Sequence, residues 1–341
     1  AAARRGTSIA IQDGLRERNF LRAVSTAQPI WLKCGHNKPN GQQHRHGLGK
    51  KNPDFFHDFY CGVFNPMLPI SSQKPFGWLT IASSLNETAM TDFKTLLQAF
   101  DQLLQPEKFK DYGPNGLQVE GRRDIQNIVS GVTASRELID AAIAAKADAI
   151  FVHHGLFWRG QDGRVVGWMK ERLQRLLAHD INLYAYHLPL DAHPELGNNA
   201  QLGKVLGLRA DAWCGDQNLV CMGQSQNQLA FENAAALSAH VAACLGRTVT
   251  CIGAHDKPVQ RIAWCSGGAQ SYFESAIAKG VDAFITGEIS EPQAHIAKET
   301  GVAFLACGHH ATERYGAPAL GAHLAEQLGV KHVFIDIDNP A

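Results

Sequence analysis

An internal repeat constrains the fold of this chain more than any other feature of its sequence. The repeated segments are residues 128–132 with 261–268, residues 142–154 with 276–288, and residues 181–186 with 302–307. When Asp148 is aligned with Asp282, His154 falls on Glu288. Self-similarity of this kind indicates a duplicated supersecondary unit. The repeat therefore predicts two similar halves, each of the form strand–helix–strand–helix–strand.

The pattern of apolar residues places strands and helices within these halves. Apolar residues recur at helical spacing over residues 93–104, 135–147 and 169–179, whereas residues 149–152 and 181–186 are short apolar runs of the kind that form buried strands. Helices that alternate with strands indicate an α/β fold with largely parallel pairing. We expect two similar α/β halves that form one core.

The segment between the two halves has a different make-up. Residues 208–257 contain a polar stretch at 224–228, an expected helix from Asn233 to Leu245 and a β-branched run at 248–252. This segment is predicted to be a small α+β insertion. The predicted organisation is a first half at residues 90–207, an inserted lobe at 208–257 and a second half at 258–341.

Residues 1–89 are unlike the rest of the chain. They contain 11 Lys and Arg against 5 Asp and Glu, and no helical or strand period persists between Cys34 and Asn65. Three interpretations compete: a transit peptide, a disordered partner-binding arm, and upstream sequence joined to a protein that begins at Met90. The acidic Asp13 and Glu17 fit a transit peptide poorly. We favour the last interpretation, and we expect no metal site at His36, His44 and His46.

Composition excludes several classes of protein. The chain has 341 residues, of which 45% are hydrophobic and 19% charged, and its formal net charge is zero. A neutral chain lacks the basic field typical of nucleic-acid binders, and no segment has the length of apolar sequence that a membrane span needs. The 8 cysteines are scattered without a CxxC pair. Reduced thiols in the cytoplasm are therefore expected rather than a disulfide framework or a structural zinc site.

Residues typical of metal ligands follow the predicted strands. His153 and His154 end the run at 149–152, and their imidazoles should diverge because neighbouring strand residues point to opposite faces. The repeat also aligns two His-x-x-x-carboxylate sequences, which place Asp191 opposite Glu313 and His187 opposite His309. Ligands of α/β sheets lie beyond the carboxyl ends of strands. We predict a dinuclear metal site formed by His153, His154, Asp191, His309 and Glu313.

Weaker candidates lie beside these five residues. His187 and His310 are each a candidate ligand, orienting residue or proton carrier, and Glu288 is a candidate general base. Several others have an ordinary structural role as the alternative: His193, the loop Gly197–Asn199, the pair Trp158–Arg159, and Cys307. Neither a glycine-rich phosphate loop nor a Gly-x-Ser-x-Gly motif is present in the sequence.

Four segments together resemble one family. They are Asp111–Val119, Val152–Gly155, His187–His193 and Gly308–Glu313. In these motifs, and over residues 90–341, the chain is similar to the YbgI-type, Nif-three-like family, whose members are often labelled GTP cyclohydrolase 1 type 2 homologs. The resemblance implies a dinuclear metal centre held by the same five ligands, a two-part α/β fold, and a hexameric ring with its metal sites facing an internal cavity. It does not extend to residues 1–89 or assign a function to residues 208–257.

The leading hypothesis is a metal-dependent hydrolase, cyclohydrolase-like, that acts on a small nucleotide-like or heterocyclic substrate. Two divalent ions would acidify a water molecule and polarise the attacked bond, with His310 or Glu288 moving protons. Mixed His and carboxylate ligation suits Zn, Mn, Fe, Co or Ni. The alternatives are a non-enzymatic, metal-dependent binding or regulatory ring, in which DNA association has weak support, and a protein in which the metals are purely structural.

Overall fold

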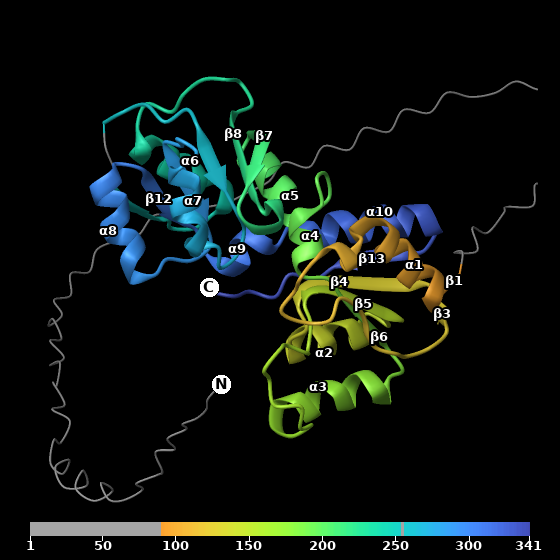
Figure 1. Ribbon diagram of the computed structural model, residues 1–341. Coiled ribbons are helices and arrows are strands. Elements are labelled where there is room, and N and C mark those ends of the chain that lie inside the picture. Colours follow the sequence, from red (N-terminus) through yellow and green to blue (C-terminus); the bar gives the residue numbers. More distant parts are fainter. Residues whose placement is uncertain (1–89, 254–255) are drawn as a thin grey trace, which may run out of the picture. The chain divides into compact units, whose positions relative to one another are not determined.

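The computed structural model describes residues 90–253 and 256–341. The predicted extension at residues 1–89 and its histidines lie outside the described residues. Two large sheets, each with helices on both faces, make up the described part of the chain (Figure 1). The predicted α/β fold is thereby confirmed. Within residues 90–253 and 256–341, no helix has both the length and the apolar character needed to cross a membrane.

The first sheet has five strands in the order β13-β4-β5-β6-β2. These strands are β2 (Gly116–Val119), β4 (Asn127–Thr133), β5 (Ala149–His154), β6 (Asn182–Ala185) and β13 (Lys331–Phe334). Strands β13, β4, β5 and β6 are parallel, and β2 pairs antiparallel with β6. In the central strand β5, Phe151 packs into one core cluster while Ile150 and Val152 pack into another. This burial on both faces is expected of a parallel strand between two helical layers.

Helices cover both faces of the first sheet. Helices α1 (Phe93–Leu104) and α10 (Gly316–Leu328) lie on one face, and α2 (Arg136–Ala144) and α3 (Gly167–Ala178) lie on the other (Figure 1). The helix predicted at residues 93–104 has these bounds, and its N-cap is Asp92. The Asp92 carboxylate accepts a hydrogen bond from the Lys94 N–H at 2.8 Å, whereas Thr91 pairs with Ile125 between β1 (Thr91–Asp92) and β3 (Asp124–Ile125).

The second sheet has six strands in the order β7-β8-β10-β11-β12-β9. They are β7 (Leu208–Cys214), β8 (Val220–Ser225), β9 (Thr250–Ile252), β10 (Ile262–Trp264), β11 (Ala283–Thr286) and β12 (Ala303–Ala306). Strands β10, β11 and β12 are parallel, as the repeat predicts. Helices α5 (Asn198–Val205) and α6 (Ala234–Leu245) pack on one face, and α7 (Phe273–Ile277) and α8 (Glu291–Thr300) on the other. Short helical elements complete the chain: α4 (Leu188–Ala192), α9 (His309–Glu313), η1 (Pro106–Lys108), η2 (Asp216–Asn218) and η3 (Gln270–Tyr272).

The repeat extends to individual hydrogen bonds. Asp148 precedes β5, and its Oδ2 accepts the N–H groups of Gln126 and Asn127, both at 2.9 Å. Asp282 precedes β11 in the same way, and its Oδ2 accepts the N–H groups of Gln260 and Arg261 at 2.9 and 2.8 Å. Each carboxylate thus fixes the start of the neighbouring parallel strand, which explains why an Asp occupies this position in both halves.

The predicted division at residues 207 and 257 does not coincide with the sheets. The segment 208–257 has the expected α+β make-up, but β7 and β8 join the edge of the second sheet through β10, and β9 joins its other edge through β12. The last strand, β13, leaves the second half and pairs with β4 in the first sheet. In the second sheet, the outer edges of the parallel strands β10 and β12 would leave N–H and C=O groups unpaired. The antiparallel strands β8 and β9 pair with these two edges.

Candidate metal centre

The five predicted ligands come from segments that follow the carboxyl ends of parallel strands. His153 and His154 end β5, and Asp191 lies in α4, immediately after β6. His309 and Glu313 lie one helical turn apart in α9, which follows β12 of the second sheet. The structure brings all five side chains into one cluster, at the strand ends where α/β sheets bind ligands.

His153 is fully buried in this cluster and presents one free nitrogen to it. Its Nδ1 lies 3.2 Å from the carbonyl oxygen of Tyr186, so that Nδ1 donates and Nε2 carries the lone pair when the ring is neutral. The Nε2 atom lies 3.6 Å from Asp191 Oδ1 and 3.4 Å from Glu313 Oε1, and it has no hydrogen-bond partner among the described residues. A buried polar atom without a partner is costly, and a metal ion would satisfy it.

Glu313 lies between two groups of side chains. Its Oε1 is the oxygen near His153, whereas its Oε2 lies 3.2 Å from His154 Nε2 and 3.1 Å from His309 Nε2. The carboxylate is 3% exposed, and Oε2 makes no hydrogen bond to the described residues. One oxygen thus faces His153 and the other faces His154 and His309, which suits a carboxylate that could bridge two ions.

The donor atoms fall into groups that could each hold a metal ion. The first group is His153, Asp191 and Glu313; the second is His154, His309 and Glu313; a third combines His153, His154 and His187. Within each group the potential ligand atoms lie within 4.8 Å of one another. Nitrogen and carboxylate donors of this kind suit divalent transition metals, so the residues fit the metal that the sequence predicts.

The charges within the cluster shift the pKa values of its histidines in opposite directions. Burial acts to lower the pKa of His153, but Asp191 and Glu313 outweigh it and raise this pKa to about 9. The adjacent carboxylates of Glu313 and Glu288 raise the pKa of His309 to about 9 despite its burial. Burial and the neighbouring His153 lower the pKa of His154 to about 3. The metal-free cluster therefore holds protons at neutral pH that a metal ion would displace.

The two carboxylates of the cluster also differ. Burial raises the pKa of Asp191, whereas His153 and His154 overcome burial and hold the pKa of Glu313 well below its usual range. Asp191 Oδ1 accepts hydrogen bonds from Asn198 Nδ2 at 2.9 Å and from Ser266 Oγ at 3.2 Å. These neutral donors fix the orientation of Asp191 without contributing a charge.

A glycine makes room for the shared carboxylate. Gly267 has φ +66°, and a Cβ atom at this position would collide with Glu313 Oε1. Its N–H donates to Thr312 Oγ1 at 2.9 Å, which ties the turn after β10 to helix α9. Only glycine tolerates both this backbone conformation and the close approach of Glu313.

Asp111 supports the site, and the sequence prediction missed this role. Its Oδ1 lies 2.7 Å from His187 Nδ1, and its Oδ2 accepts the N–H of Leu188 at 2.9 Å and an N–H of Asn115 at the same distance. The bond from Asp111 leaves His187 Nε2 directed at the pair His153 and His154, and the His187 ring lies 4.9 Å from that of His153. The sequence marks Asp111–Val119 only as part of the family resemblance, and it does not reveal the contact with His187 because 76 residues separate Asp111 from His187.

The two residues predicted to move protons occupy different positions. Glu288 Oε1 lies 2.6 Å from His309 Nδ1, so it orients a candidate ligand. His310 Nε2 lies 3.2 Å from Asp336 in the C-terminal segment and belongs to none of the three metal-ligating groups. Burial and Arg314 lower the pKa of His310. The geometry thus favours an orienting role for Glu288, and the predicted catalytic roles of both residues stay predictions.

The weaker candidates lie around the cluster. His193 Nδ1 accepts the N–H of Leu196 at 3.0 Å and stabilises a turn, and Gly197 is the N-cap of α5. Trp158 meets His187 edge to face at 5.1 Å between ring centres. Burial raises the pKa of Cys307 to about 12, so this side chain is a thiol and not a thiolate nucleophile at neutral pH.

The part of the chain that carries this cluster matches a known protein family. Residues 91–340 match the family model described as Duf34/NIF3 (NGG1p interacting factor 3). The chain is 52% identical over 241 residues to a protein of Neisseria meningitidis named GTP cyclohydrolase 1 type 2 homolog, with 71% of this chain and 96% of the relative covered. It is 57% identical over 235 residues to a protein of the same name from Yersinia pestis, with 68% and 93% covered.

A solved structure agrees with these sequence matches. It is described as protein ybgI of unknown function, and it superposes on this chain with a TM-score of 0.70 and 47% sequence identity. The superposition covers 74% of this chain and all of that structure. The match shows that this chain shares its fold with that protein.

Proposed function

This chain belongs to the Duf34/NIF3 family, and on that premise we propose that it is a dinuclear metal protein and a metal-dependent hydrolase. Its substrate class in this proposal is a small nucleotide-like or heterocyclic compound. The name of these relatives, GTP cyclohydrolase 1 type 2 homolog, supports the substrate class.

One observation carries the proposal. The two oxygens of Glu313 face two different sets of donors, and the buried atoms His153 Nε2 and Glu313 Oε2 have no hydrogen-bond partner among the described residues. Such atoms are normally paired in a folded protein. One ion would be held by His153, Asp191 and Glu313, and the other by His154, His309 and Glu313.

The protein residues would prepare the site for hydrolysis. Divalent ions, when bound, acidify water and polarise the bond under attack. His187 is the residue best placed to accept or return a proton, because Asp111 fixes its Nδ1 and leaves Nε2 directed at the cluster. Glu288 fixes Nδ1 of His309 in the same manner and keeps Nε2 turned toward Glu313.

The experiment that tests the proposal measures metal and turnover on the same samples. Wild-type protein, purified without added metal or chelator, is expected to contain about two metal ions per chain. The double variant His153→Ala/Glu313→Ala should lose both while circular dichroism shows a folded protein, and Arg164→Ala, an exposed residue of the loop before α3, serves as the control. The metal-loaded wild type should hydrolyse GTP or a member of a panel of nucleotides and heterocycles. Binding of the panel without any turnover would contradict the hydrolase proposal and favour the alternative of a metal-dependent binding protein.

We also propose that the chain assembles with itself into a hexameric ring. Family membership supports this part of the proposal. Light scattering coupled to gel filtration should then give a mass six times the 37.1 kDa of one chain. A monomeric mass would contradict it.

A further inference from the structure

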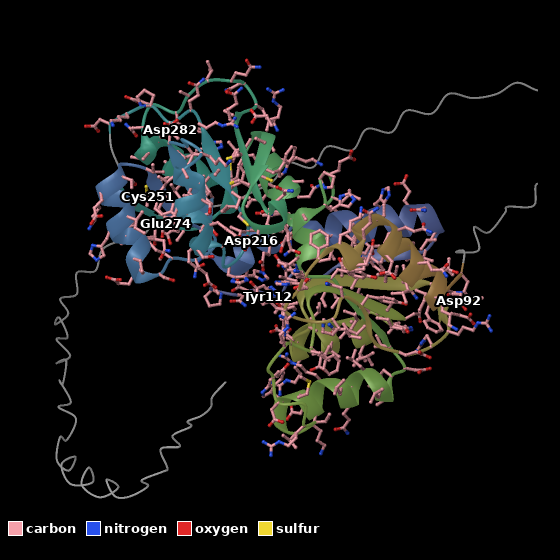
Figure 2. The ribbon with its side chains drawn as sticks, in the orientation of Figure 1. Asp92, Tyr112, Asp216, Cys251, Glu274 and Asp282 are labelled. Atoms are coloured by element: carbon pink, nitrogen blue, oxygen red, sulfur yellow. The ribbon has the colours of Figure 1, made fainter. Side chains whose placement is uncertain are left out.

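A second pocket adjoins the metal-ligating cluster. It has a volume of about 370 Å³ and lies between residues of the first half and residues of the β7–β8 connection and η3. Lys110, Tyr112 and Arg159 line it from the first half, and Asp216, Gln217 and Tyr272 line it from the other side. Figure 2 labels Tyr112 and Asp216, which lie near each other from the two sides. None of these six side chains belongs to the groups that could hold a metal.

The pocket offers two cations that are not neutralised by the protein. No carboxylate of the described residues forms an ion pair with Lys110 or Arg159. Arg159 Nη2 donates to the backbone carbonyl of Asp111 at 2.5 Å, which holds the guanidinium at the rim and leaves its other N–H groups for a ligand. The Asp111 carboxylate itself is occupied by His187, Asn115 and backbone N–H groups. Asp216 is the one acidic side chain of the wall not so occupied. The formal charges of the lining balance, so an anion would depend on direct contact with Lys110 and Arg159 rather than on an excess of positive charge.

The pocket also offers aromatic surface. Tyr112 is 62% exposed, which is unusual for a large aromatic ring. Its ring meets the His187 ring edge to face, with 6.0 Å between the ring centres. Burial and the charge of Asp216 raise the pKa of Tyr272 to about 12, so its phenol is neutral and able to donate a hydrogen bond at physiological pH. A planar ring can stack on a tyrosine of this kind.

The wall of the pocket is fixed by an interaction between distant segments. The Gln217 side chain accepts the N–H of Lys110 at 2.7 Å and donates to the Lys110 carbonyl at 3.3 Å. Gln217 and Asn218 both have positive φ, at 54° and 58°, which is an uncommon conformation for residues other than glycine. Backbone strain of this kind is retained where the surroundings require it, often next to a binding site. Here the strained turn holds Lys110 beside Arg159.

We infer that this pocket anchors a phosphorylated ligand with a planar heterocyclic ring, of about the size of one nucleoside monophosphate, next to the metal centre. Lys110 and Arg159 would bind the phosphate, and Tyr112 would stack on the ring. Asp111 connects the two sites, because it lines the pocket and its carboxylate also orients His187. The inference deepens the proposed function and rests on it for the reaction that the anchored ligand undergoes. The pocket volume suits one nucleotide rather than a nucleic-acid strand.

Binding measurements on the protein as purified test the inference separately from catalysis. The probes are guanosine 5′-monophosphate, guanosine and ribose 5-phosphate, titrated by calorimetry in samples of measured metal content. The wild type should bind guanosine 5′-monophosphate more tightly than either fragment. The variant Lys110→Met/Arg159→Met should bind it about tenfold or more weakly with unchanged metal content. The control variant Lys170→Met/Arg164→Met, which removes the same charges outside the pocket, should bind it normally.

The aromatic part of the pocket has its own matched pair of variants. Tyr112→Leu should weaken binding of guanosine 5′-monophosphate by about fivefold or more, and Tyr112→Phe should retain it, because only the first removes the stacking ring. Equal affinity in wild type and Lys110→Met/Arg159→Met, or no binding of any probe to the wild type, would overturn the inference. Binding of a short single-stranded DNA, but of none of the three probes, would also overturn it. Wild type that takes up no metal but still binds the nucleotide through this pocket would support the inference while refuting the proposed metal chemistry.

Discussion

The two candidate ligand groups share Glu313 but differ in how far they are withdrawn from water. In the first group, His153 is fully buried and Asp191 is 7% exposed. In the second, the side chains of His154 and His309 are 18% and 29% exposed. The orienting partners differ in the same way, since His153 Nδ1 is held by a main-chain carbonyl and His309 Nδ1 by Glu288, whose side chain is 46% exposed.

This difference suggests different tasks for the two positions. A closed set of ligands favours a permanently held ion, whereas an open position can admit water or substrate. In the closed group, two of the three ligands come from β5 and α4 of the first half, whereas in the open group two of the three come from α9 of the second half. The duplicated fold thus supplies similar strand ends but not equivalent sites. The expected consequences of four changes follow, from the largest effect to the smallest.

Replacing the shared carboxylate should abolish both positions together. Glu313→Gln keeps the shape of the side chain but removes the charge that faces both groups, so metal content is expected to fall to near zero by elemental mass spectrometry. Glu288→Gln is the matched control, because Glu288 contacts only His309 of the five candidate ligands, and it should retain the buried ion. A Glu313→Gln protein with undiminished metal content would refute the bridging role.

A methyl group placed against Glu313 should weaken metal binding without altering any ligand. Gly267→Ala introduces a Cβ that collides with Glu313 Oε1, and the expected loss of metal affinity is about 10- to 100-fold, as for other residues that support ligands. Gly280→Ala is the control, because Gly280 has a similar φ of 73° but no atom within 4 Å of the position that the added methyl group would occupy. Competition with a fluorescent chelator measures both affinities, and equal effects in the two variants would show that only backbone strain matters.

Loss of the Asn198 side-chain amide, which donates to Asp191, should lower the stability of the folded protein. Asn198 is fully buried, donates to Asp191 at 2.9 Å and accepts the N–H of Gly316 at 2.8 Å. Asn198→Ala removes one of the two hydrogen bonds to Asp191 Oδ1 and the acceptor of the Gly316 N–H, and it should lower the free energy of unfolding in urea by about 1–3 kcal/mol. Gln201→Ala in the same helix, where the amide contacts only the carbonyl of Glu195, should change stability by much less. Similar losses in the two variants would argue against a special role for Asn198.

Metal affinity should rise with pH up to about 9. Because the pKa values of His153 and His309 are both raised to about 9 in the metal-free protein, an ion that binds at neutral pH must displace protons. Each displaced proton makes the apparent affinity rise about tenfold per pH unit below that pKa, and the dependence should level off above it. Chelator competition across this pH range measures the slope. An affinity that stays constant or falls between neutral pH and about 9 contradicts these pKa directions.

Local sequence patterns predicted much of this architecture. The helical period over residues 93–104 gave the bounds of α1, and the aligned Asp148 and Asp282 mark equivalent strand starts with equivalent hydrogen bonds. The five candidate ligands were predicted from strand ends, and the structure gathers them in one cluster. These features depend on residues that are close in sequence or related by the repeat.

Contacts between distant segments were not predictable in this way. Strand β13 pairs with β4 across 204 residues in the register of Lys331 with Asn127, and no local period reveals such a partner. The same holds for the pairing of β8 with β10 and for the bond between Asp111 and His187. A turn-forming Asp resembles an orienting Asp in sequence, since the two differ only in which distant side chain reaches the carboxylate.

A zinc titration of chelator-treated protein tests most directly whether the cluster holds two unequal metal positions joined by Glu313. Calorimetry of the wild type should resolve two binding steps per chain, and His309→Ala should lose the weaker step while keeping the tighter one, because His309 belongs only to the more exposed group. A single step in the wild type, or the loss of both steps in His309→Ala, would contradict the account.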